Sequence, residues 1–98
     1  MTNPRWLQCP EELSQAAKAF WNEHAGRLHA SEDLVRHNIV DFTILCRLMA
    51  LIGTAAAEIE TFGVTLTTVT GTRKVNPACG VLLSAQRQAA PLLARFCL

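Results

Sequence analysis

The stretch from Ser31 to Gly63 constrains the fold more than any other part of this sequence. It is the longest segment with helical periodicity, and apolar residues occupy most of its circumference. Ser31 is a suitable N-cap residue and Gly63 a suitable terminator, which together predict a helix over about residues 32–62. A helix that is apolar on so many sides needs several neighbours. The rest of the chain, or further copies of it, must supply them.

The composition favours a single domain that associates with itself. The chain has 98 residues, of which 50% are hydrophobic and 17% are charged. A chain of this length forms one domain with a small core, so surplus apolar surface favours a homo-oligomer. No run of about 18 uninterrupted apolar residues is present, so we expect no membrane-spanning helix and no membrane partner. The N-terminus also lacks the apolar core of a secretory signal.

Side chains that could carry chemistry are few and scattered. Four cysteines, at positions 9, 46, 79 and 97, form no CxxC pair, and none lies at zinc-finger spacing from a histidine. We therefore expect reduced thiols in a cytosolic protein, with a disulfide scaffold as the alternative. The sequence has no phosphate-binding glycine loop, no GxSxG or HExxH motif and no paired carboxylates beside a base. These absences predict a protein that is not an enzyme and has no metal or cofactor.

Two segments precede the central helix. Residues 1–9 are expected to be a lead-in segment, with Trp6 and Leu7 as its apolar anchors. Pro10 suits the first position of a helix, because its missing N–H would be unpaired there. The spacing of apolar residues after it predicts a first helix over about residues 10–27.

Two further elements are predicted after the central helix. The stretch 64–75 is β-branched and threonine-rich with Gly71 near a turn, which predicts a short hairpin. Asn76 followed by Pro77 is a strong start for a last helix over about residues 77–96. The predicted fold is mainly α: one helical domain over residues 10–98, with a three-helix core, a long central helix and a short β-hairpin between the second and third helices.

The charges are distributed unevenly along the chain. Residues 1–60 contain all eight acids and five bases, whereas residues 61–98 contain four bases and no acid. The four bases are Arg73, Lys74, Arg87 and Arg95. Such an asymmetry favours a surface for nucleic acid or for an acidic partner, although a solvated face explains four charges equally well.

The order of these features resembles the small subunit of phage DNA-packaging terminases of the tailed-phage and prophage type. The elements that carry the resemblance are Pro10-x-x-Leu13-x-x-x-Ala17-x-x-x-Trp21, the long helix with Cys46 that ends at Gly63, Asn76-Pro77-Ala78 and Leu92-x-x-x-Phe96. They cover about residues 10–98. The resemblance implies a non-enzymatic protein of the host cytoplasm. It also implies a ring of identical chains that binds double-stranded viral DNA and recruits or stimulates the large terminase subunit, which holds the ATPase and nuclease.

With that resemblance, the basic residues and the small residues acquire expected roles. Arg73, Lys74, Arg87 and Arg95 are expected to contact DNA phosphates and not bases. The expected subunit interface comprises Leu48, Ile52, Gly53, Ala56 and Ile59, because Gly53 and the alanines after it allow another helix to approach closely. Family members commonly carry basic segments at both ends, which are not found in this sequence, so DNA binding by this chain alone is expected to be weak.

A second interpretation comes from a different functional class. A small helical adaptor or regulator that binds another protein through its apolar surface also accounts for the high apolar fraction and the low charge. It predicts no affinity for DNA and a stable complex with one protein partner. Mass in solution and salt-dependent DNA binding distinguish the two interpretations.

Overall fold

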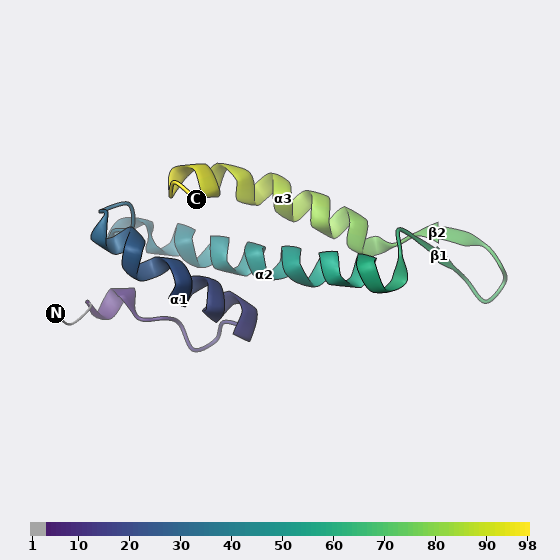
Figure 1. Ribbon diagram of the computed structural model, residues 1–98, viewed down its shortest axis with the longest axis horizontal. Coiled ribbons are helices and arrows are strands. Elements are labelled where there is room, and N and C mark those ends of the chain that lie inside the picture. The colour runs from purple at the N-terminus through teal and green to yellow at the C-terminus, as the bar shows by residue number, and fades with distance from the viewer. Residues whose placement is uncertain (1–3) are drawn as a thin grey trace.

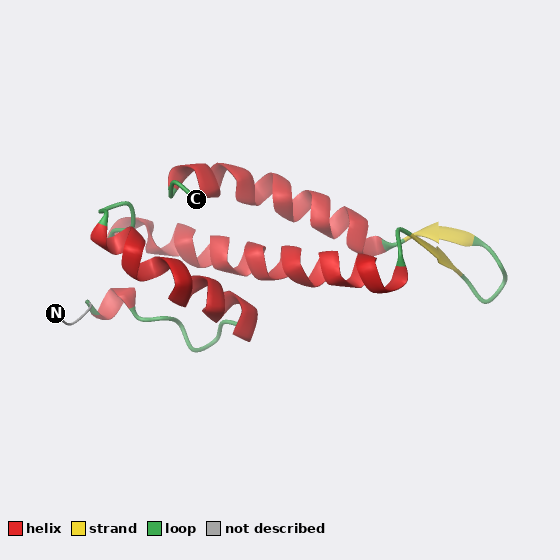
Figure 2. Ribbon diagram, viewed as in Figure 1, coloured by secondary structure: helices red, strands yellow, loops and turns green. Residues whose placement is uncertain are grey.

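The computed structural model describes residues 4–98 and contains three helices and one hairpin. Figures 1 and 2 show the elements in order: α1 (Gln15–Ala30), α2 (Ile39–Phe62), β1 (Thr65–Thr67), β2 (Arg73–Val75) and α3 (Pro77–Arg95). Two short 3-10 helices lie at Arg5–Leu7 and Arg36–Asn38. The fold is therefore mainly α with a hairpin between the second and third helices, as the sequence predicts.

The long helix α2 forms the centre of the molecule. In Figure 1, α3 runs back along α2 on one side and α1 lies on the other side, next to the first half of α2. The second half of α2 and the first half of α3 therefore form a two-helix stem that α1 does not reach, and the hairpin extends beyond it (Figure 1). The molecule is elongated, with extents of 60 × 24 × 17 Å.

The first helix starts later than the sequence suggested. We expected a start at Pro10, but residues 11–13 form a turn in which the Leu13 amide donates to the Pro10 carbonyl. The helix begins at Gln15, because the side chain of Ser14 accepts a hydrogen bond from the Ala17 amide at 3.2 Å. A serine hydroxyl that satisfies an unpaired amide of the first turn is a stronger start than a proline that only fixes φ.

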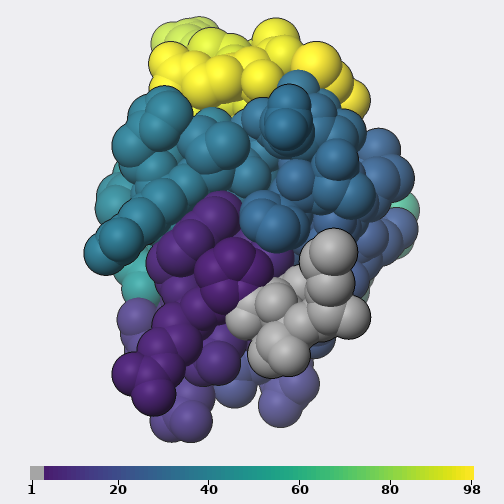
Figure 3. All heavy atoms as spheres, turned by 90° about the vertical axis from the view of Figure 1, so that its left-hand side faces the viewer, coloured from purple at the N-terminus to yellow at the C-terminus, as the bar shows by residue number. Residues whose placement is uncertain are grey.

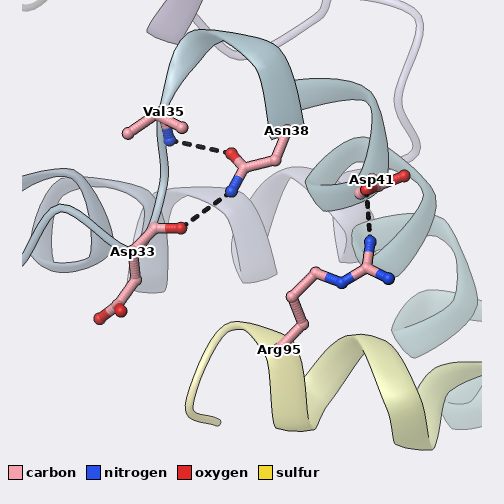
Figure 4. A network of polar contacts seen from close by, with 5 residues as sticks. All are labelled: Asp33, Val35, Asn38, Asp41 and Arg95. Carbon is pink, nitrogen blue, oxygen red and sulfur yellow. Dashed lines mark hydrogen bonds and ion pairs between the residues drawn. The ribbon is translucent and has the colours of Figure 1, made fainter.

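The second helix also starts later than expected, at Ile39 and not near residue 32. Ser31 does not cap it, because its hydroxyl donates to the carboxylate of Asp33 at 2.6 Å and lies 3.1 Å from the carbonyl of Leu28, which is a second possible acceptor. The side chain of Asn38 orders the loop before α2 instead. It accepts from the Val35 amide at 2.8 Å and donates to the Asp33 carbonyl at 3.0 Å (Figure 4). These two bonds fix a compact connection between α1 and α2.

Phe42 lies at the centre of the core, where all three helices meet. It is fully buried, and its ring centroid lies 5.0 Å from that of Trp21 and 5.5 Å from that of Phe96. Trp21 is a core residue, and Cys46 is buried in the same cluster as a small hydrophobe. Leu7 of the lead-in segment and Leu13 of the turn before α1 also contribute to the core, because both are buried in the same cluster.

Part of the apolar surface of α2 is buried inside the molecule. Judged by length and composition alone, the helical stretch Arg36–Phe62 is long and apolar enough to cross a bilayer, although Asp41 and Arg47 interrupt it. In the structure, Phe42, Leu45 and Cys46 are completely buried against the other helices. The core therefore accounts for part of the apolar surface, and the lack of a membrane partner stays a prediction.

Candidate nucleic-acid interface

The hairpin is the most exposed part of the basic half of the chain. Its two strands pair antiparallel, with Thr67 opposite Arg73 and Leu66 opposite Lys74. A tight turn connects them, in which the Gly71 amide donates to the Thr68 carbonyl at 2.9 Å. Gly71 has a φ of 84°, which a residue with a side chain rarely adopts. The glycine therefore allows the strands to reverse direction within a few residues.

The two basic residues of the hairpin point to opposite faces. Successive residues of a strand alternate between faces, and residues directly opposite each other share one. Arg73 therefore shares a face with Thr67, and Lys74 shares the other face with Leu66. Both basic residues are exposed. The hairpin thus carries one positive charge on each side.

Threonine hydroxyl groups stiffen the turn. Thr68 contacts Thr70 at 3.0 Å through their hydroxyl oxygens, and the Thr68 hydroxyl also accepts a hydrogen bond from the Thr72 amide at 3.1 Å. In addition, the Thr68 amide donates to the Thr72 carbonyl at 2.8 Å. An isolated two-stranded hairpin is marginally stable in water, so these local bonds help to keep the exposed hairpin ordered.

Asn76 fixes the base of the hairpin. It is 1% exposed and is the one buried polar side chain among residues 4–98. Its Oδ1 accepts a hydrogen bond from the Ala78 amide at 3.0 Å and caps α3, as the sequence predicts. Its backbone amide donates to the Val64 carbonyl at 2.7 Å. One residue therefore joins the end of the hairpin to both flanking segments.

The other two predicted DNA contacts lie elsewhere. Arg87 is exposed in the middle of α3, and Arg95 is near its end, in a helix of 19 residues that is about 28 Å long. Arg95 donates to Asp41 at 2.7 Å (Figure 4). Figure 3 shows this end of the molecule, where the C-terminal residues (yellow) lie against the residues around the start of α2 (blue to teal). The structure therefore does not gather the four bases into one patch.

The residues expected at the subunit interface divide into two groups. Leu48 and Ile52 pack in part against the core of their own chain. Gly53 is open, because nothing lies within 4 Å of the place where a Cβ would be. It belongs to a shallow groove of about 340 Å³ between α1 and α2, next to Phe20 and Met49. Ala56 and Ile59 are half-buried in the stem beyond α1.

Sequence reasoning missed two tertiary contacts of this region. The side chain of Asn76 also donates to the Gly63 carbonyl at 2.9 Å, across thirteen residues. The Asp41–Arg95 ion pair spans fifty-four residues. The Asn-Pro pair predicts a helix cap, but nothing in it predicts the second bond. The sequence gives no pairing signal between Asp41 and Arg95 either, because α2 and α3 each carry further charged residues and the two partners lie far apart in the chain.

The cysteines of the described chain are all free thiols, and residues 4–98 hold no group of three or more metal-ligating side chains. Burial raises the pKa of the Cys46 thiol to about 12 and also raises the pKa of the Cys9 thiol. A thiol with a raised pKa is mostly protonated at neutral pH and is a poor nucleophile. Neither of these two cysteines therefore suits covalent chemistry.

Comparison with known families identifies one match. Residues 17–98 match the family described as phage terminase, small subunit, which covers most of the chain and includes α1 from its third residue, α2, the hairpin and α3. No curated protein and no solved structure matches the chain.

Proposed function

The chain belongs to the phage terminase small-subunit family, and from this premise we propose how it serves viral genome packaging. It is a non-enzymatic subunit that assembles as a ring in the host cytoplasm. The ring binds double-stranded viral DNA and recruits or stimulates the large subunit, which contains the ATPase and the nuclease. The family match supports the packaging role, and the exposed hairpin supports the DNA contact.

The hairpin is the observation that carries the DNA-binding proposal. It extends beyond the helices (Figure 1), and Arg73 and Lys74 lie on its opposite faces. The major groove of DNA is wide enough for a two-stranded ribbon. A hairpin that enters it tip first has a phosphate backbone on each side. Arg73 then contacts one backbone and Lys74 the other, so the contacts hold the hairpin in the groove without reading sequence.

The remaining bases contribute less to this contact. Arg87 is exposed on α3 and adds to the positive field of the acid-free segment 61–98. Arg95 lies about 28 Å from the start of α3 along the helix, and Asp41 compensates its charge. We therefore rank Arg73 and Lys74 as the principal phosphate contacts, Arg87 as a secondary one and Arg95 as the weakest.

The proposed ring uses the part of α2 that α1 leaves uncovered. Ala56 and Ile59 are half-buried there, and Gly53 lines a groove beside the start of α1. A neighbouring chain that packs on these residues, together with Leu48 and Ile52, completes the burial of the stem. Packing a helix closely against small side chains brings many atoms into contact, which supports this choice of surface.

A mobility-shift titration with double-stranded DNA tests the DNA contact. The variant Arg73→Ala/Lys74→Ala should bind about tenfold or more weakly at low salt. The matched control is Arg5→Ala/Arg36→Ala, which removes the same charge from two exposed residues outside the basic half of the chain. The control should keep most of the affinity. Equal losses of affinity in both variants would show that net charge, and not the hairpin, determines DNA binding. No binding by the wild type would favour the adaptor that does not bind DNA.

A further inference from the structure

One exposed face of α2 carries a regular pattern that the proposed function does not use. Spacings of four and three residues alternate along it, which is the a/d pattern of a coiled coil. We call this face the α2 seam. Its residues are Val40, Ile44, Arg47, Leu51, Thr54, Glu58 and Thr61. Three of them are exposed large hydrophobics, at 66% for Val40, 45% for Ile44 and 44% for Leu51. Such a stripe normally packs against another helix.

The chain's own helices lie on other sides of α2. α1 packs near Met49 and Gly53, and α3 approaches Ala55. Phe42, Leu45 and Cys46, which point into the core, are fully buried, whereas all seven seam residues are exposed. The seam is therefore not part of the core of this chain.

The polar residues of the seam are suited to burial. The Thr54 hydroxyl donates to the Ala50 carbonyl at 3.1 Å, and the Thr61 hydroxyl donates to the Ala57 carbonyl at 2.9 Å. These bonds are made inside the helix, so covering the threonines leaves no hydroxyl unpaired. Arg47 and Glu58 are different, because neither takes part in an ion pair within residues 4–98. Each therefore needs an opposite charge if the seam is covered.

The positions of these two charges indicate which occupant and which orientation fit. We propose that the α2 seam binds the α2 seam of a second copy of this chain, antiparallel and related by a two-fold axis between Ile52 and Gly53. Arg47 and Glu58 lie at equal distances in sequence on either side of that axis. Each Arg47 then faces Glu58 of the other copy, so two ion pairs form. A parallel arrangement would place like charges opposite each other, which is unfavourable.

The same axis places the apolar residues against suitable surfaces. Leu51 of one copy lies opposite Thr54 of the other, beside a groove of about 260 Å³ between α2 and α3. That groove is lined by Leu51, Thr54, Ala55, Glu58, Pro77, Ala78 and Val81. A leucine side chain that enters it is removed from water, and Glu58, the one charged residue of the lining, is the residue that pairs with Arg47 of the other copy. Ile44 lies opposite Thr61, whose hydroxyl is already bonded.

This contact is separate from the one proposed for the ring. The ring contact uses Leu48, Ile52, Gly53, Ala56 and Ile59, and none of these residues belongs to the seam. Pairing along the seam joins chains two by two, and it does not depend on the DNA contact or on the proposed ring. Loss of the seam contact therefore leaves DNA binding by the hairpin unchanged.

Charge reversal tests the proposal by sedimentation velocity over a dilution series, with circular dichroism to verify the fold. Arg47→Glu and Glu58→Arg should each weaken the two-fold step by about tenfold or more, because each replaces two attractive contacts by two repulsive ones. The double variant Arg47→Glu/Glu58→Arg should restore wild-type association, since both pairs form again with reversed sign. An equimolar mixture of the two single variants should also associate.

The matched control is Glu60→Arg, an exposed glutamate of the same helix outside the seam, which should leave the two-fold step unchanged. Single variants that associate like the wild type would overturn the proposal. So would a double variant as weak as the single ones, because a parallel pair or a different protein on the seam gives no reciprocal rescue. Binding of the wild type to lipid vesicles with loss of the two-fold step would likewise overturn it.

Discussion

The side-chain amide of Asn76 donates a hydrogen bond to the backbone carbonyl of Gly63 at 2.9 Å and so closes the base of the hairpin. Gly63 ends α2 with a φ of 84°, and Asn76 caps α3. The bond therefore joins the two helix ends from which the hairpin extends. Since Asn76 is buried and uses both of its side-chain polar atoms, it sets the direction of the hairpin relative to the stem.

Replacement of Asn76 should destabilise the protein and loosen the hairpin together. Asn76→Ala removes the cap of α3 and the bond to Gly63, so the free energy of unfolding should fall by roughly 1–3 kcal/mol in urea titrations. Asn76→Asp keeps an acceptor for the Ala78 amide but buries a carboxylate oxygen against the Gly63 carbonyl, so it should lose stability as well. An Asn76→Ala variant as stable as the wild type would show that the amide does not hold the hairpin base.

Phe42 should be the most sensitive position of the core. It is fully buried and contacts Trp21 and Phe96, so Phe42→Ala removes contacts with both α1 and α3. The expected loss is about 3–5 kcal/mol in thermal or urea unfolding, a large part of the stability of a domain of this size. The matched control is Phe62→Ala on the same helix, because Phe62 is exposed and its loss should be small. Comparable losses at the two positions would contradict the described core.

The Asp41–Arg95 pair should add little to stability and should restrain DNA binding. Both side chains are substantially exposed, so a double-mutant cycle should give a coupling of about 0.2–1 kcal/mol. Asp41→Asn leaves Arg95 uncompensated, which should raise DNA affinity slightly at low salt. Arg95→Gln should not have that effect. A weaker affinity of Asp41→Asn than of the wild type would contradict the claim that the pair restrains DNA binding.

Stability should fall at alkaline pH because of Cys46. Burial raises the pKa of its thiol from 9.0 to about 12, so the folded protein holds this proton more tightly than the unfolded chain. This contribution to the free energy of unfolding is fully present below about pH 9. It is lost as the pH rises towards 12, by up to about 1.4 kcal/mol per pH unit. Urea titrations at pH 8 to 11 measure it. Cys46→Ala should be less stable but should lack this extra pH dependence.

Local signals in the sequence predict which elements are helices and which are strands. Helix starts are predicted less accurately, because several neighbouring residues can act as the cap. The β-branched run before Gly71 and the Asn76-Pro77 pair predict the hairpin and the start of α3 correctly. The starts of α1 and α2 were wrong, because several residues near each start can act as caps. Ser14 rather than Pro10 begins α1, and Asn38 orders the turn before α2. Which cap forms depends on tertiary packing.

The arrangement of the candidate sites was less predictable than the elements. The sequence identifies four basic residues in a segment without acids. It does not reveal that Arg73 and Lys74 lie on opposite faces of the hairpin, or that Arg95 forms an ion pair with Asp41. Those facts depend on strand register and on a contact between distant residues. The spacing of the α2 seam is also present in the sequence. Its exposure becomes apparent when the sides of α2 that α1 and α3 cover are known.

The salt dependence of DNA binding tests the central claim most directly. Each phosphate contact contributes a slope of about −0.9 to the logarithm of affinity against the logarithm of salt concentration. Arg73→Ala/Lys74→Ala should therefore make the slope less steep by about 1.8 per bound chain, whereas Arg5→Ala/Arg36→Ala should leave it near the wild-type value. The same slope for the wild type and the hairpin variant would contradict a hairpin that binds DNA through Arg73 and Lys74.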